Sequence, residues 1–102
     1  MYDFSSRTGL IFNDAGAANI IVAALKNNIF IKENIFALFS GPAEKIWIDN
    51  LPDIKCNTSI ENILDNTKKI YVGTGWMTDI EYNAIKYSVN KEKEVIAIID
   101  HW

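Results

Sequence analysis

The sequence predicts an α/β domain built on a parallel, doubly wound β-sheet, and three observations lead to this fold class. Short apolar runs that are typical of strands alternate with longer segments of helical periodicity. The runs at residues 35–39 and 95–99 are uniformly apolar, as strands covered on both faces of a parallel sheet tend to be. The spacing of the strands requires crossovers, and right-handed helical crossovers produce a parallel sheet with helices on its faces.

The first half of the chain contains two strand–helix units. Residues 10–12 form a short apolar run, and residues 17–27 follow as a helix rich in small and aliphatic side chains that let it lie close to a sheet. Residues 35–39 form the second strand. Pro42 suits the first position of a helix. The apolar face of that short helix is expected to contain Ala43, Ile46 and Trp47.

The second half repeats the alternation with three further strands. A weak third strand is expected at residues 54–56, a fourth at 70–72 and a fifth at 95–99. Two capping boxes, each a threonine followed three residues later by a glutamate, mark helix starts at residues 58–61 and 78–81. We expect about five mostly parallel strands in the order 3-2-1-4-5, with the flavodoxin-like order as the alternative.

Composition excludes several classes of function. With 49% hydrophobic residues, 23% charged residues and a net charge of −3, the chain is globular and lacks the clustered positive charge of a nucleic-acid binder. A single cysteine, Cys56, allows no internal disulfide, and with one histidine a zinc site is improbable, so we expect no metal and no cofactor. No signal peptide and no membrane span is recognisable, which predicts a cytoplasmic setting.

Candidate ligand-binding residues follow the first and fourth predicted strands. In the order 3-2-1-4-5 these strands are neighbours where the strand order reverses, and ligands of open parallel sheets bind at that point. The first loop leads into a helix N-terminus, which favours an anion. The alternative is that Gly16 only permits a tight turn and Asn19 is only a polar residue of the first helical turn, without a ligand. The expected binding residues are Asp14, Gly16, Asn19, Gly73, Thr74, Gly75 and Trp76.

Trp76, after the fourth predicted strand, and His101 with Asp100, after the fifth, suggest specific chemistry. Trp76 offers a ring on which sugars or flat rings stack, or alternatively covers the helix that follows it. His101, the only histidine, is a candidate catalytic residue together with Asp100, as a general base or a ligand of a sugar hydroxyl. Because adjacent residues on a strand point to opposite sides, the direct partner of His101 would be Asp14. The alternative is a surface histidine near the chain end.

Four segments stand out in order along the chain: Asp14–Asn19, Gly41–Ala43, Gly73–Trp76 with the acidic Asp79–Glu81 after it, and Asp100–Trp102. Together they resemble the N-terminal half of bacterial proteins with a GT-B-like architecture of two Rossmann-like domains. That group includes sugar-nucleotide epimerases and glycosyltransferases of surface-polysaccharide synthesis.

The resemblance implies a single Rossmann-like three-layer domain over residues 1–102, corresponding to the N-terminal half of a longer protein. It implies a site in a cleft between two domains, with the nucleotide held mainly by the other half, so that this chain alone would not be fully active. The residues that would line one wall of the cleft are Gly16, Asn19, Gly73, Thr74, Trp76, Asp100 and His101.

Three functions therefore stay open from the sequence. The first is a domain of a glycosyltransferase or sugar-nucleotide epimerase whose partner is a small molecule, a sugar nucleotide or glycan precursor. The second is a regulatory module that binds a nucleotide or another anion without chemistry. The third is an interface domain that meets a second domain or further copies of the chain through its three tryptophans.

Overall fold

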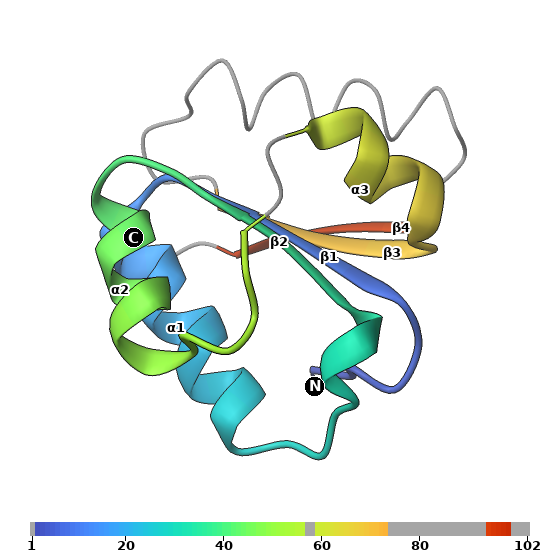
Figure 1. Cartoon of the computed structure of the whole chain (residues 1–102), viewed down its shortest axis with the longest axis horizontal. Coiled ribbons are helices and arrows are strands. Elements are labelled where there is room, and N and C mark those ends of the chain that lie inside the picture. The colour runs from blue at the N-terminus through green and yellow to red at the C-terminus, as the bar shows by residue number, and fades with distance from the viewer. Residues whose placement is uncertain (1, 57–58, 74–93, 99–102) are drawn as a thin grey trace.

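The structure, a computed structural model, describes residues 2–56, 59–73 and 94–98 of the 102-residue chain. Four parallel strands form one sheet in the order β2-β1-β3-β4, with helices packed on it (Figure 1). The strands are β1 (Thr8–Phe12), β2 (Ile35–Phe39), β3 (Lys69–Gly73) and β4 (Glu94–Ile98). The helices are α1 (Ala15–Lys26), the 3-10 turn η1 (Lys32–Asn34), α2 (Pro42–Asn50) and α3 (Ile60–Asn66). No helix in these ranges is long and apolar enough to cross a membrane.

The predicted strand order is confirmed for four of the five expected strands. β1 pairs with β2 on one side and β3 on the other, and β3 pairs with β4. The flavodoxin-like alternative is wrong, because it would insert the segment 54–56 between β1 and β3. That segment instead touches the outer side of β2, through one isolated bridge between Ala37 and Cys56.

The expected third strand at residues 54–56 does not form, and the backbone of Ile54 explains why. Its N–H donates to the Leu51 carbonyl at 3.2 Å in a turn. Its carbonyl accepts a hydrogen bond of 2.7 Å from the indole Nε1 of Trp47. Both backbone groups of Ile54 are thus engaged away from the sheet, and only Cys56 is left to reach β2.

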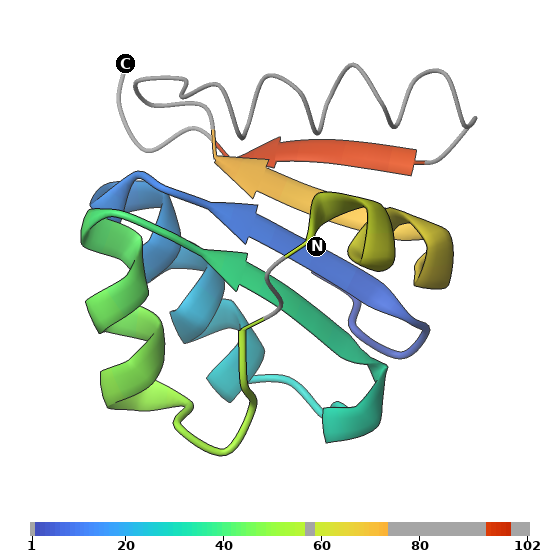
Figure 2. The ribbon, with the colours of Figure 1, turned by 45° about the horizontal axis from the view of Figure 1, so that its top comes forward.

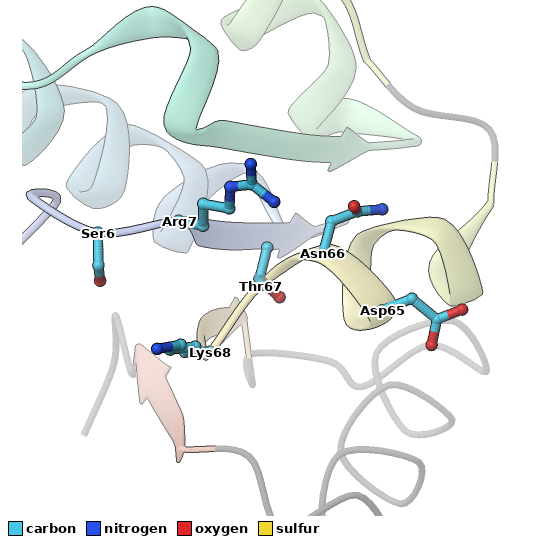
Figure 3. Close-up of a pocket in the computed structure, with 6 residues that line it drawn as sticks. All are labelled: Ser6, Arg7, Asp65, Asn66, Thr67 and Lys68. Carbon is cyan, nitrogen blue, oxygen red and sulfur yellow. The ribbon is translucent and has the colours of Figure 1, made fainter.

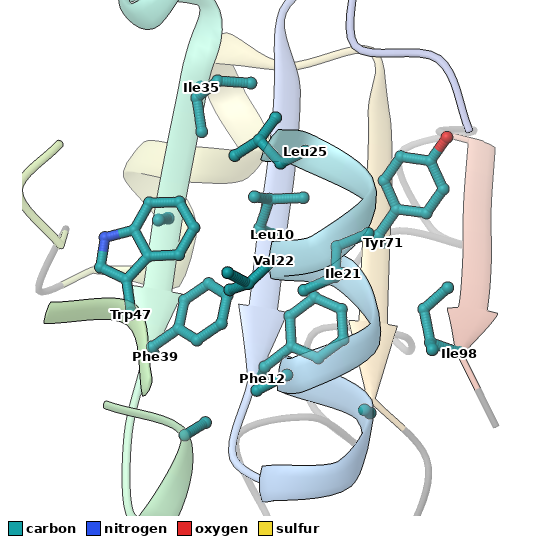
Figure 4. Close-up of a cluster of buried hydrophobic side chains, with 14 of the residues drawn as sticks. Leu10, Phe12, Ile21, Val22, Leu25, Ile35, Phe39, Trp47, Tyr71 and Ile98 are labelled. Carbon is teal, nitrogen blue, oxygen red and sulfur yellow. The ribbon is translucent and has the colours of Figure 1, made fainter. Parts of the chain in front are cut away.

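Helices α1 and α2 cover one face of the sheet and bury its largest side chains (Figure 4). Ala17 and Ala18 are fully buried, so the small residues of α1 bring it close to the strands as predicted. The rings of Phe12, Phe39 and Trp47 stack in series, with centroids 5.2 Å apart for the first pair and 4.5 Å for the second. The predicted inner face of α2 is confirmed: Ala43 and Trp47 are buried, and Ile46 is partly buried and packs against the same cluster.

Helix α3 covers the opposite face, where the packing is aliphatic. Ile63 and Leu64 pack against Ile11, Ile70 and Val72. The N-cap of α3 is Ser59, whose hydroxyl accepts from the Asn62 N–H at 3.3 Å, and not the predicted Thr58. Figure 2 shows α3 across the sheet from α1 and α2, so that the described helices lie on both faces.

Close approach of α3 to the sheet depends on Gly9 in the middle of β1. A β-carbon at this position would lie 2.8 Å from Cγ2 of Ile63 and 3.2 Å from Cγ1 of Ile70. The hydroxyl of Thr67, at the end of α3, donates to the Ile63 carbonyl at 2.8 Å and is buried. The glycine and the buried hydroxyl together fix the position of α3.

The segment before β1 is bound to β3 on the α1 side. The Asp3 N–H donates to the hydroxyl of Tyr71 at 3.0 Å, and Phe4 is buried against the same ring. Lys69, only 8% exposed, places its Nζ 3.5 Å from the Asp3 carboxylate. Hydrogen bonds from Ser5, and then the charge of Lys69, hold the pKa of Asp3 below its ordinary value.

Candidate functional site

Helix α1 begins directly after β1, and Asp14 forms its cap. The residue has an extended backbone, and its Oδ2 accepts a hydrogen bond of 2.8 Å from the Ala17 N–H. Gly16 lies within the first turn of α1 and not in a loop before it. Because a carboxylate already occupies the positive end of the helix, this end offers a hydrogen-bond acceptor as well as backbone N–H groups.

The turns after β1 and β2 are bound to each other through Asn13. Its side-chain Nδ2 donates to the Ser40 hydroxyl at 3.0 Å, and its carbonyl accepts from the Ala43 N–H at 3.2 Å. Gly41 has a φ of 53°, and a β-carbon there would lie 2.6 Å from Asn13 Nδ2. Only glycine fits this position, for both reasons. The starts of α1 and α2 are therefore held in a fixed arrangement at one edge of the sheet.

Sequence reasoning missed Asn13, although one signal was present. Gly41 directly before Pro42 marks a turn with a special backbone conformation after the second strand. Nothing in the sequence alone shows that a residue from the end of a different strand binds this turn.

The carboxyl ends of β1 and β3 lie side by side at this edge. Ile11 and Val72 are register partners, so Gly73 follows one position after the pair and Asp14 follows three positions after Ile11 (Figure 2). The structure thus brings Asp14, Gly16 and Gly73 to the same edge of the sheet. Gly73 is buried as the last residue of β3.

Asn19 lies further along α1 and is exposed. With Lys26 and Asn50 it lines a cavity of about 360 Å³ between α1 and α2, where the Lys26 Nζ donates to Asn50 Oδ1 at 3.3 Å. The five other predicted site residues lie outside the described residues: Thr74, Gly75, Trp76, Asp100 and His101. Their roles stay predictions.

A cavity of about 220 Å³ lies beside α2 and includes Trp47 and Cys56 in its lining. Burial is the main reason that the pKa of the Cys56 thiol is raised. A raised pKa lowers the fraction of reactive thiolate, which argues against Cys56 as a nucleophile. Among the described residues, no cluster of three or more histidine, cysteine or acidic side chains is placed to hold a metal ion.

Comparison with known proteins identifies no relative: no protein-family model, no curated protein and no solved structure matches the chain.

Proposed function

We propose that this domain binds a sugar nucleotide or a related glycan precursor at the carboxyl ends of its strands, as one Rossmann-like part of a glycosyltransferase or sugar-nucleotide epimerase. The observation that carries the proposal is the direct pairing of β1 with β3. The chain adds β2 on one side of β1 and then crosses to the other side, and ligands of open parallel sheets bind where this reversal occurs.

The chemistry of Asp14 supports a ligand rich in hydroxyl groups. Its Oδ2 caps α1, which leaves Oδ1 as an acceptor for a sugar hydroxyl. A phosphate at the same place would be repelled by the carboxylate. The sugar is therefore assigned to the start of α1, and the phosphates to a position further from Asp14.

The remaining predicted residues complete the proposal. The ring of Trp76 would stack on the sugar or base, and the backbone of residues 73–75 would approach the ligand closely. His101, with Asp100, would act as general base or bind a hydroxyl. The fixed contact of Asn13 with Ser40 supports a site that is formed before the ligand arrives.

Titration of isotope-labelled protein with UDP, UDP-N-acetylglucosamine and CMP tests the proposal. We expect the amide resonances of Gly16, Gly73 and Gly75 and the ring resonances of His101 to move together and saturate with the sugar nucleotide. The Asp14→Asn variant keeps a capping side chain but lacks the charge, and it should weaken binding of the sugar nucleotide more than binding of UDP.

Two results would count against the proposal. If no resonance moves at millimolar ligand, the domain alone does not bind such compounds. If UDP and CMP bind as tightly as the sugar nucleotide and Asp14→Asn has no effect, the domain is a nucleotide- or anion-binding module without a sugar site.

A further inference from the structure

Two positive side chains lie next to each other at the opposite, amino-terminal edge of the sheet. The Lys68 N–H donates to the Arg7 carbonyl at 3.3 Å, and the two residues directly precede the register partners Thr8 and Lys69. Both side chains are exposed and line one cavity (Figure 3). Arg7 and Lys68 are therefore like charges in neighbouring positions of adjacent chain segments.

Neither positive group has a carboxylate partner among the described residues. Within the described part of the chain, the ion pairs are Lys45 with Asp49 and Lys69 with Asp3, and neither includes Arg7 or Lys68. Asp65 lines the same cavity but forms no ion pair there. A bound anion would supply a counter-charge for both groups.

The cavity has the size and the polar groups to hold such an anion. Its volume of about 560 Å³ is in the range of small-molecule sites. Figure 3 shows the guanidinium of Arg7 and the ammonium of Lys68 extending in different directions from the two adjacent chain segments, with Ser6 beyond the start of the strand; all three residues line the cavity. The Asn66 amide nitrogen donates to the carbonyl and side chain of Asn62 at 2.6 and 2.8 Å, which leaves its oxygen as an acceptor.

We propose that this cavity binds the phosphate group of a small phosphorylated molecule through Arg7 and Lys68. Guanidinium and ammonium groups are the usual protein partners of phosphate oxygens. Asn66 and Asp65 accept hydrogen bonds from hydroxyl groups on the rest of the molecule. This second site is independent of the sugar-nucleotide site, since it lies at the other end of the strands.

A purely structural role for the two cations makes a different prediction. Arg7 and Lys68 lie near the C-terminal end of α3, whose helix dipole is negative and attracts positive charge. In that role, loss of either charge lowers stability in every buffer. In the proposed role, neither charge has an ion-pair partner without phosphate, so loss of either charge leaves the stability in chloride unchanged.

Thermal unfolding in chloride and in inorganic phosphate, at matched pH and ionic strength, separates the two roles. We expect phosphate at about ten times its Kd to raise the Tm of the unchanged protein by roughly 5 °C or more. Arg7→Gln and Lys68→Gln should each remove this increase without lowering the Tm in chloride. Lys32→Gln removes an exposed lysine elsewhere and should respond like the unchanged protein.

The proposal is overturned if phosphate gives no increase beyond chloride, or if the increase survives in both variants. It is also overturned if both variants lower the Tm in chloride and respond to phosphate as Lys32→Gln does.

Two further measurements identify the source of the phosphate group and the location of the site. Glucose 6-phosphate, but not glucose, should shift the amides of Ser6, Arg7 and Lys68 and leave those of Gly16 and Gly73 unchanged. Shifts confined to Gly16 and Gly73 would contradict this second site while agreeing with the sugar-nucleotide site. The second measurement is sedimentation of the protein with vesicles that contain phosphatidic acid. If the protein sediments with them and this binding depends on Arg7 and Lys68, the phosphate belongs to a lipid headgroup and the small-molecule proposal is overturned.

Discussion

The two faces of the sheet are stabilised in different ways. On the α1/α2 face, sixteen described residues form one buried cluster that includes the stacked rings of Phe12, Phe39 and Trp47. On the α3 face, the buried cluster of described residues has five members and all are aliphatic. The first face depends on volume, because large side chains fill it. The second depends on close approach, because Gly9 lets α3 reach the sheet. Substitutions should therefore destabilise the first face by removing volume and the second face by adding it.

The largest expected effect is loss of volume at Trp47. Trp47→Ala removes a fully buried ring from the stack and the donor to the Ile54 carbonyl, and should lower the free energy of unfolding by about 3–5 kcal/mol. Urea unfolding followed by circular dichroism measures it. Trp47→Phe keeps a stacked ring and should cost clearly less. A loss below about 1 kcal/mol for Trp47→Ala would mean that the first face does not depend on volume.

On the second face, added volume should be harmful. Gly9→Ala places a β-carbon against Cγ2 of Ile63, an atom bound directly to the Ile63 β-carbon and unable to swing away freely. We expect a loss of about 1–3 kcal/mol. In a double-mutant cycle with Ile63→Ala, the combined loss should be smaller than the sum of the two single losses. Strict additivity would show that Gly9 and Ile63 are not in contact.

A smaller effect is expected where a hydroxyl holds the end of α3. Thr67→Val keeps the shape of the side chain but removes the hydrogen bond to the Ile63 carbonyl, which should cost about 1 kcal/mol. Thr67→Ser keeps the hydroxyl and serves as the control for the lost bond. Equal stability of the valine variant and the unchanged protein would mean that this hydrogen bond does not stabilise the α3 face.

The smallest effect concerns the pH dependence of the N-terminal segment. The pKa of Asp3 is lower in the folded protein than its ordinary value of 3.8. The ionised carboxylate therefore stabilises the fold above that value, and this contribution is lost as the pH falls through the lower, folded-state pKa. Asp3→Asn should flatten the acid limb of the stability curve below about pH 4. An unchanged acid limb would exclude a stabilising role for the ionised Asp3 carboxylate, which accepts a hydrogen bond from the Ser5 N–H and lies near Lys69.

The α1/α2 face was largely predictable from the sequence, and the reasons are local. Small residues at 17 and 18 and the spacing of Ala43 and Trp47 identify the faces that are buried. The prediction of a weak strand at residues 54–56 was wrong because the indole of Trp47 binds the Ile54 carbonyl, a contact that apolar patterning does not reveal.

The site was predictable only where it follows from topology. The pairing of β1 with β3 follows from the predicted strand order and brings Asp14 and Gly73 to one edge. The link between Asn13 and Ser40 was missed because it joins the ends of two strands that are 27 residues apart. The charges of Arg7 and Lys68 also gave no signal, since the two residues are 61 positions apart in the sequence, each beside the start of a different strand.

The central position of β1 has a consequence for the order in which the protein is synthesised. Thr8 and Lys69 are register partners although 61 residues separate them. At translation rates of about 5–20 residues per second, β1 leaves the ribosome roughly 3–12 seconds before its β3 partner. During that interval β2 and α1 can already pair and pack with β1, but Ile11 has no β3 and no α3 to cover it. The nascent chain therefore exposes an apolar strand face for seconds, and a molecule that binds such faces would meet this domain before it is complete.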